Sequence, residues 1–199
     1  PQRVLIPQVE IATGIRRLGL EVAERLDGRR VLMTPVLNGA LRFAAELIGA
    51  LGEVALEIEP VIVRSYAGTV SLPAQIDWLR LQPHQVRGAH LLLVDDIFDT
   101  GQTLHRLIAE LESFGPASMT CAVMLPKEGR CLPENQVEID YVGWTIPDEF
   151  VVGMGLDYRG YFRNLPDVRA LTPEEQAQID AALTSLDHVP PFASGTSRP

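Results

Sequence analysis

The 199 residues fit one compact domain, and a chain of this length can bury about 70% of its unfolded surface. With 17 Lys+Arg against 26 Asp+Glu, the net charge of −9 argues against nucleic acid or an anionic membrane as the main partner. Cys121 and Cys131 are too few for a disulfide framework, and no apolar run approaches the ~18 residues of a membrane helix. The amino-terminal residues lack the apolar core of a signal peptide, so we expect a cytoplasmic protein.

The first part of the chain alternates helix-like and strand-like patterns. Apolar residues from Ile11 to Leu26 are spaced by three or four positions, which predicts an amphipathic helix that ends at Asp27-Gly28. The apolar run 31–37 predicts a strand buried on both faces, and a helix follows it. A second strand is expected over 57–65 and a long loop over 66–88.

The middle of the chain repeats this alternation. Residues 90–94 predict a third strand, Thr103 begins an amphipathic helix, and residues 119–125 predict a fourth strand. Apolar strands that alternate with such helices predict an α/β fold with a mainly parallel sheet flanked by helices. Ligands of these sheets bind at the carboxyl ends of the strands, so the loops after the first, third and fourth strands are the candidate site.

The last part of the chain has a different pattern. Residues 141–144 and 150–156 are typical of short strands with no long helix between them, which indicates a separate small lobe. Thr172-Pro173 predicts the N-cap and first residue of a helix over 173–186. Residues 190–199 are expected to form a flexible tail.

The most informative segment is residues 90–107, where a strand runs through two groups of polar residues into a helix: Asp95-Asp96 and Asp99-Thr100-Gly101-Gln102-Thr103. Gly101 lets the backbone approach a ligand, and helix-start amides can donate to a phosphate together with the hydroxyls of Thr100 and Thr103. The carboxylates of Asp95 and Asp96 would repel phosphate but accept hydrogen bonds from vicinal sugar hydroxyls. Phosphate donors beside diol acceptors indicate a site for a ribose 5-phosphate.

A plainer interpretation of this segment is an acidic turn that caps a helix. It would suffice for a single Asp or Thr, but it does not explain the whole string after an apolar strand. The sequence has neither G-x-x-x-x-G-K-[ST] nor a strand followed by G-x-G-x-x-G, which excludes a Walker loop and the dinucleotide fingerprint.

The segment resembles the signature for phosphoribosyl pyrophosphate (PRPP) in the type I phosphoribosyltransferases, and its Asp-Thr-Gly form most resembles the 6-oxopurine branch. Residues 36–47, 63–68 and 141–166 are similar, in the same order, to segments of the hypoxanthine-guanine phosphoribosyltransferase family. The resemblance spans most of residues 5–168. It implies the type I phosphoribosyltransferase fold with a small hood lobe.

The resemblance also implies a domain organisation. One phosphoribosyltransferase domain would cover residues 1–189, with its core over 30–140. The hood would combine the amino-terminal segment with residues 141–171, and the helix over 173–186 would be an extension beyond the usual end of the family.

The implied activity is purine salvage. The 5-phosphoribosyl group of PRPP would pass to N9 of hypoxanthine or guanine, with release of pyrophosphate and with Mg²⁺ as cofactor. Asp95 and Asp96 would hold the ribose hydroxyls, and residues 99–103 would hold the 5-phosphate. Asp99 would also be the catalytic base that accepts the N7 proton as N9 bonds to the sugar.

Further matches imply roles for the purine and metal subsites. Lys127 would donate to the 6-oxo group and so discriminate against adenine. Phe150 would stack on the purine, and the backbone of Val151 would meet the edge of the base. Asp157 would bind Mg²⁺ directly or through water. Taken singly, Lys127 would be interpreted as a solvated loop lysine, and Phe150 and Val151 as ordinary core residues.

The pyrophosphate would be held by Arg163 and by the turn Leu37-Asn38-Gly39, where the family often has a non-proline cis peptide. Ser65 and Tyr66 match the start of a mobile loop that closes over the site. Asn38 departs from the family pattern because relatives usually carry Lys or Arg there. Asp95 replaces a more usual Glu, which shortens the reach to the ribose by one methylene group.

Two alternatives stay open at this point. One is an enzyme of the same fold that prefers xanthine, since contacts to the 2-position of the base are not visible in the sequence. The other is a non-catalytic regulator that binds PRPP or a nucleotide. The resemblance further implies a homodimer or homotetramer with small-molecule substrates and without nucleic-acid or membrane partners.

Overall fold

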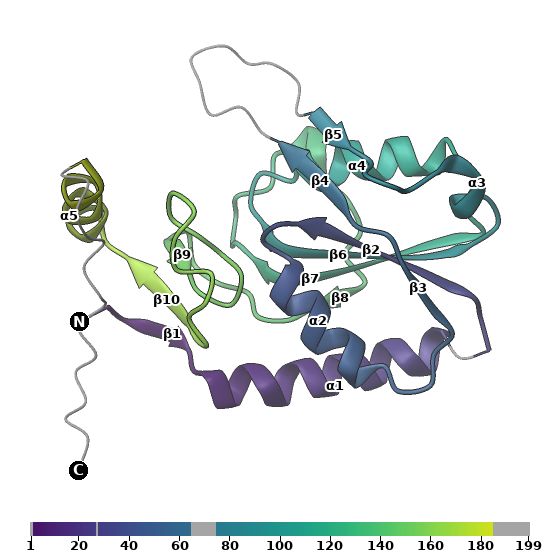
Figure 1. The fold of residues 1–199 in the computed structure, drawn as a ribbon, viewed down its shortest axis with the longest axis horizontal. Helices are drawn as coiled ribbons and strands as arrows, with labels where there is room; N and C mark the ends of the chain where they lie inside the picture. The colour runs from purple at the N-terminus through teal and green to yellow at the C-terminus, as the bar shows by residue number, and fades with distance from the viewer. Residues whose placement is uncertain (1, 27, 65–74, 185–199) are drawn as a thin grey trace.

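The computed structural model describes residues 2–26, 28–64 and 75–184 (Figure 1). Ser65 and Tyr66 of the expected mobile loop and the expected tail 190–199 lie outside the described residues. The described helices and strands are, in chain order, β1 (Val4–Ile6), α1 (Gln8–Leu26), β2 (Val31–Leu37), α2 (Leu41–Ala50), β3 (Leu56–Ile58), β4 (Val61–Arg64), β5 (Gln75–Asp77), α3 (Pro83–Val86), β6 (His90–Phe98), α4 (Gln102–Glu112), β7 (Ser118–Pro126), the 3-10 turn η1 (Pro133–Asn135), β8 (Tyr141–Val142), β9 (Phe150–Val152), β10 (Val168–Leu171) and α5 (Pro173–Thr184).

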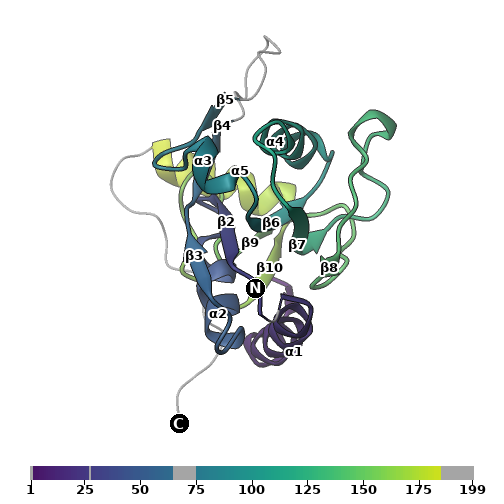
Figure 2. The ribbon, with the colours of Figure 1, turned by 90° about the vertical axis from the view of Figure 1, so that its right-hand side faces the viewer.

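The main sheet has seven strands in the order β5-β4-β2-β6-β7-β8, with β3 paired beside β2. All its pairs are parallel except β4 with β5. Helices α1 and α2 cover one face and α4 covers the other (Figure 2), so residues 91–94 of the central strand β6 are fully buried. The predicted α/β fold with a mainly parallel sheet flanked by helices is confirmed.

The strand expected over 57–65 is divided into β3 and β4. Pro60 lies between them and has no N–H to donate to the ladder, so the pairing is interrupted there although both pieces pair with β2. The loop expected over 66–88 contains, in its described part, the short strand β5 and the helical turn α3.

Strand β6 continues to Phe98, beyond the expected end at Val94. Its parallel ladder with β7 runs on through Asp95 and Ile97 to Phe98. The continuing ladder with β7 holds this acidic stretch in extended conformation, so Asp95 and Asp96 lie inside the strand and not in the turn after it.

A second sheet of three antiparallel strands, in the order β1-β10-β9, forms the small lobe (Figure 1). Strands β1 and β10 were not expected, because three or four residues are too short to show a period. Strand β8 was expected in this lobe but pairs with β7 in the main sheet. The lobe therefore combines the start of the described chain with segments after residue 149.

Helix α5 begins at Pro173 as predicted, and Thr172 and Glu175 form reciprocal cap hydrogen bonds of 2.9 and 3.2 Å. Its buried Ile179 packs on Val152, Phe162 and Leu171 of the small lobe. Thr184 is the last described residue of the helix. None of the helices in the described ranges is long and apolar enough to cross a membrane.

Candidate active site

A cavity of about 280 Å³ lies between the carboxyl end of the main sheet and the small lobe. The sequence predicted functional roles for most of the residues that line it. Those residues come from the ends of β6 and β7, from β9 and from the turn after β9, and they are Asp96, Ile97, Asp99, Lys127, Phe150, Val151, Leu156 and Asp157. The structure thus brings together six predicted residues from segments far apart in the chain.

The turn between β6 and α4 is shaped for close approach of a ligand. Gly101 is the N-cap of α4 and has a φ of 80°, which favours glycine, and it provides no side-chain cap. The first-turn amides of α4, from Gln102 and Thr103 onward, therefore keep donor capacity for an anion. On the other side, the carbonyl of Thr100 accepts hydrogen bonds from Leu132 N and from Asn135 Nδ2, each at 3.2 Å.

The two acidic residues of β6 have different surroundings. Asp95 is 4% exposed, and its Oδ1 accepts a hydrogen bond of 3.1 Å from the Asp96 amide. Burial and the adjacent Asp96 carboxylate raise the pKa of Asp95 well above its ordinary value. Burial also raises the pKa of Asp96, which is half-buried and lines the cavity. Such groups are costly to keep ionised, which is typical of binding sites.

The side chain of Asp96 lies directly against the turn after β2. A Cβ atom on Gly39 would overlap the Asp96 carboxylate, and a Cβ on Gly155 would overlap the Gly39 carbonyl. The Leu37-Asn38 peptide is cis, as the resemblance implies. The turn is therefore packed between β6 and the segment after β9 without room for an added methyl group.

Asp99 and Lys127 belong to a cluster of four charged side chains at the mouth of the cavity. Lys127 Nζ lies 3.4 Å from Asp99 Oδ2 and 3.2 Å from Asp148 Oδ1. Arg130 Nε donates to Asp99 Oδ1 at 2.8 Å and lies 3.5 Å from Asp148 Oδ1. The Lys127 side chain is 10% exposed, so it is not the solvated loop lysine of the plain interpretation.

Lys127 is the only lysine in the sequence, and the other sixteen of the 17 Lys+Arg residues are arginines. A lysine ammonium is a compact charge that can donate to one acceptor atom, whereas a guanidinium is a broad fork. The one lysine of the sequence thus lies in this cavity, where a compact charge suits a single acceptor atom.

Asp157 and Arg163 form a second polar group on the far wall of the cavity. Arg163 Nη2 lies 2.6 Å from Asp157 Oδ1, and its Nη1 donates to the Gly155 carbonyl at 2.6 Å. The Gly160 amide donates to Asp157 Oδ2 at 2.6 Å. The carboxylate is thus held by the turn that follows it and by the guanidinium.

Phe150 and Val151 form the apolar wall of the cavity. The Phe150 side chain is 41% exposed, whereas Val151 is buried and its backbone pairs with Ala170 of β10. The rings of Phe150 and Tyr158 are nearly perpendicular, with centroids 5.4 Å apart. A half-exposed aromatic face at a cavity wall is suited to stacking on a planar ligand.

Four residues in or around the site were not identified from the sequence: Arg130, Asn135, Asp148 and Tyr158. Arg130 follows Lys127 by three positions in the same loop, and Asp148 precedes Phe150 by two, so proximity to predicted residues was the available signal. Asn135 and Tyr158 act through tertiary contacts that no local pattern indicates.

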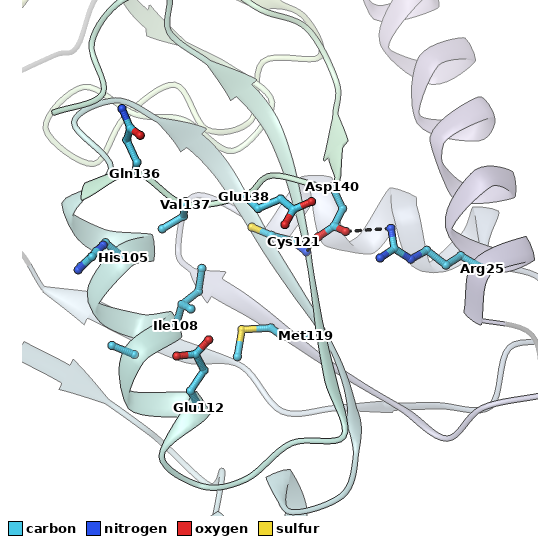
Figure 3. Close-up of a pocket in the computed structure, with 11 residues that line it drawn as sticks. Arg25, His105, Ile108, Glu112, Met119, Cys121, Gln136, Val137, Glu138 and Asp140 are labelled. Atoms are coloured by element: carbon cyan, nitrogen blue, oxygen red, sulfur yellow. Dashed lines mark hydrogen bonds and ion pairs between the residues drawn. The ribbon is translucent and has the colours of Figure 1, made fainter. Parts of the chain in front are cut away.

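A second cavity, of about 420 Å³, lies between α4, β7 and the segment before β8 and is lined by none of the predicted residues (Figure 3). Its acidic Asp140 pairs with Arg25 of α1 at 2.9 Å and accepts from the Cys121 amide at 2.8 Å. These contacts attach α1 to the edge of the main sheet, which is a structural role.

No group of three or more His, Cys, Asp or Glu residues suited to a metal ion occurs in the described part of the chain.

The parallel sheet, its glycine-containing turn before α4 and the paired carboxylates of β6 define an α/β enzyme that binds a sugar phosphate. The family model described as "Phosphoribosyl transferase domain" matches residues 7–159.

Relatives narrow this class further. The hypoxanthine-guanine phosphoribosyltransferase of Streptococcus pneumoniae is 35% identical over 174 residues, 87% of this chain and 94% of the relative. The hypoxanthine phosphoribosyltransferase of Escherichia coli is 33% identical over 165 residues, 82% of this chain and 91% of the relative. A solved structure of the hypoxanthine phosphoribosyltransferase of Trypanosoma cruzi matches with a TM-score of 0.81 and 32% identity, over 90% of this chain and 95% of that one. The chain belongs to the phosphoribosyltransferase family, in its hypoxanthine-guanine branch.

Proposed function

We propose that this enzyme transfers the 5-phosphoribosyl group of PRPP to N9 of hypoxanthine or guanine and releases pyrophosphate. The observation that carries the proposal is the pairing of Lys127 with Asp99, 3.4 Å apart beside the exposed face of Phe150. A donor and an acceptor next to an aromatic wall match the two polar edges and the flat face of a 6-oxopurine. The alternative of a non-catalytic regulator gains no support, because it would need no proton acceptor beside the base.

In the proposed chemistry, one group of side chains acts on the purine base and another holds the phosphates of PRPP. As N9 of the base bonds to C1 of the ribose, the bond from C1 to pyrophosphate breaks and the leaving group takes the electron pair. Asp99 accepts the N7 proton, so that the purine product is neutral. Lys127 donates to the 6-oxo group. Adenine has an amino donor at this position and would leave the Lys127 ammonium without an acceptor.

The phosphate end is held without a large positive field, in keeping with the net charge of −9. The turn over residues 99–103 would bind the 5-phosphate through backbone amides and hydroxyls. Asp95 and Asp96 would accept hydrogen bonds from the ribose hydroxyls. Arg163 and the turn Leu37-Asn38-Gly39 would hold the pyrophosphate.

The residues present fit a Mg²⁺ ion that is shared with the substrate. Mg²⁺ sites commonly use one or two carboxylates together with substrate phosphates, and Asp157 supplies one half-buried carboxylate beside the Arg163 guanidinium. The absence of a three-ligand cluster in the described residues agrees with this arrangement. When bound, the ion would neutralise charge on the pyrophosphate as it leaves.

The test is an assay of the purified protein with PRPP and Mg²⁺ against hypoxanthine, guanine, xanthine and adenine in parallel. We expect product with hypoxanthine or guanine, none with adenine, and loss of activity when the metal is chelated. Product with xanthine in clear preference would replace the proposed base specificity. Formation of no nucleotide from any of the four bases would overturn the proposal.

We also propose a cytoplasmic location and assembly into a homodimer or homotetramer. Both cysteines of the sequence are free, which suits a reducing compartment. Size-exclusion chromatography with light scattering would measure the mass of the assembly. A monomer at micromolar concentration would contradict the proposed oligomer.

A further inference from the structure

Helix α5 packs against the part of the small lobe that carries the purine wall. Its buried Ile179 contacts Val152, Phe162 and Leu171, so the helix is fixed to β9 and β10 by an apolar cluster. Residues 173–184 lie outside the segment that matches the family model, which ends at residue 159. The helix is therefore an element of this chain whose contribution to the site the family match does not describe.

Asp180 of α5 makes polar contacts with the turn that follows Asp157. Tyr158 Oη donates a hydrogen bond of 2.9 Å to Asp180 Oδ1, and Arg159 Nε lies 2.7 Å from the same oxygen. The Arg159 side chain is 59% exposed, so its ion pair is expected to contribute little. The Tyr158 hydroxyl is part-buried and is the contact that matters.

The other side of Tyr158 meets Phe150. The two rings are nearly perpendicular, with an interplanar angle of 88° and centroids 5.4 Å apart. Phe150 lines the cavity of about 280 Å³ and also a neighbouring cavity of about 540 Å³ beside the start of α5. Because Phe150 lines two cavities and is 41% exposed, the perpendicular contact with the Tyr158 ring is well placed to set the orientation of the Phe150 ring.

We propose that Asp180 is a positioning residue for the purine subsite: by holding the Tyr158 hydroxyl, it orients the Tyr158 ring, which in turn holds Phe150 at the stacking angle. The proposal rests on the proposed function, in which Phe150 stacks on the base. Asp157 does not depend on this link, because its turn is closed by the hydrogen bonds between Tyr158 and Tyr161 and by the Gly160 amide.

The kinetic test compares four variants. Tyr158→Phe and Asp180→Ala each remove the hydrogen bond and should raise KM for hypoxanthine about fivefold, the equivalent of one ordinary hydrogen bond, with kcat and KM for PRPP nearly unchanged. Asp180→Asn keeps an acceptor for the hydroxyl and should restore the purine KM. Gln178→Ala changes an exposed position of the same helix and should behave as wild type.

The double variant Tyr158→Phe/Asp180→Ala should raise the purine KM no further than either substitution alone, because both break the same hydrogen bond. Equal increases of both KM values, or an unchanged purine KM in Tyr158→Phe, would overturn the positioning role. Tyr158→Phe is nearly isosteric, so it provides the decisive reading if Asp180→Ala folds poorly.

Hydrogen exchange of the free protein tests the link separately from catalysis. Amides in the peptide over residues 150–158 should exchange faster in Tyr158→Phe and Asp180→Ala than in wild type or Asp180→Asn. Faster exchange in Tyr158→Phe and Asp180→Ala, together with a wild-type protein that makes no nucleotide, would support the link and refute the proposed function. Unchanged exchange together with normal wild-type turnover would refute the link alone.

Discussion

Arg130 Nε donates a hydrogen bond of 2.8 Å to Asp99 Oδ1, although 31 positions separate the two residues in the chain. The other oxygen of the same carboxylate lies 3.4 Å from Lys127 Nζ. Both cations come from the loop after β7, whereas Asp99 comes from the end of β6. The parallel pairing of these strands therefore fixes the direction of the carboxylate that we assign as the base.

Replacement of this carboxylate tests its role. Asp99→Asn keeps the shape and one acceptor oxygen but cannot take the N7 proton, so we expect kcat to fall about 100-fold or more, with KM for PRPP little changed. Steady-state kinetics with each substrate varied in turn would separate the two constants. Glu128→Gln, an exposed acid in the neighbouring loop, is the control. Equal turnover in Asp99→Asn would remove Asp99 as the base.

The single lysine gives a direct reporter of base binding. Lys127→Met should raise KM for hypoxanthine about tenfold or more, because a hydrogen bond from a charged donor is lost. In the wild type, an amine-reactive acylating reagent can modify only Lys127 and the α-amino group, which peptide mass spectrometry distinguishes. Hypoxanthine should protect Lys127 and leave acylation of the α-amino group unaffected. Acylation of Lys127 at the same rate with and without the base would mean that the base does not contact it.

The buried carboxylate of Asp95 predicts a pH dependence of stability. Its pKa is raised in the folded protein, so between the unfolded and folded pKa values the native state binds more protons than the unfolded state. The free energy of unfolding should therefore decrease as pH rises through this window. The whole decrease is reached once the pH exceeds the pKa of Asp95 in the folded protein. Asp95→Asn removes the ionisation and should raise the free energy of unfolding at pH 7.

The measurement is urea denaturation of wild type and Asp95→Asn from pH 3 to pH 8. The advantage of the variant should vanish below the ordinary pKa of 3.8, where both forms are neutral. Glu53→Gln, at an exposed turn position, should show no comparable gain. We expect Asp95→Asn to lose affinity for PRPP while it gains stability, and a variant that is less stable at pH 7 would contradict the assignment.

Two glycines form a matched pair for the turn Leu37-Asn38-Gly39. Gly155 and Gly52 both have positive φ, of 104° and 63°, so Ala at either should cost about 1 kcal/mol of stability. Only a Cβ on Gly155 would meet the Gly39 carbonyl; nothing lies within 4 Å of one on Gly52. Gly155→Ala should therefore also raise KM for PRPP, while Gly52→Ala should not. Similar PRPP kinetics in the two variants would show that the contact with Gly39 is dispensable.

The long strands β2, β6 and β7 could be predicted because they are continuous apolar runs, and helices α1, α2 and α4 because their apolar residues are strongly periodic. The run of Leu and Val in β6 and the spacing in α1 indicate their structure without tertiary information. The division at Pro60 has a local cause that the sequence displays. The place of β8 in the main sheet has no local cause in the sequence, because a strand of two residues shows no period. Its place is decided by pairing with β7.

The sequence could likewise indicate some residues of the candidate site and not others. Asp95 to Thr103 could be proposed as candidates because one short segment supplies possible phosphate donors and diol acceptors together. Arg130 and Asp148 could not, because their significance comes from Asp99 and Lys127, which tertiary folding brings to them. The predicted roles of the individual site residues stay predictions until the variants above are measured.

Pairing of β1 with β10 joins residues 4–6 to residues 168–171. On a translating ribosome, every strand of the main sheet has been made once Val142 has emerged, whereas the small lobe waits for β10. A nascent chain thus has the turn that we propose to bind the 5-phosphate well before it can complete the wall that we propose to bind the base. Long-range strand pairing is slow, so we expect the purine side of the pocket to be completed after its phosphate side.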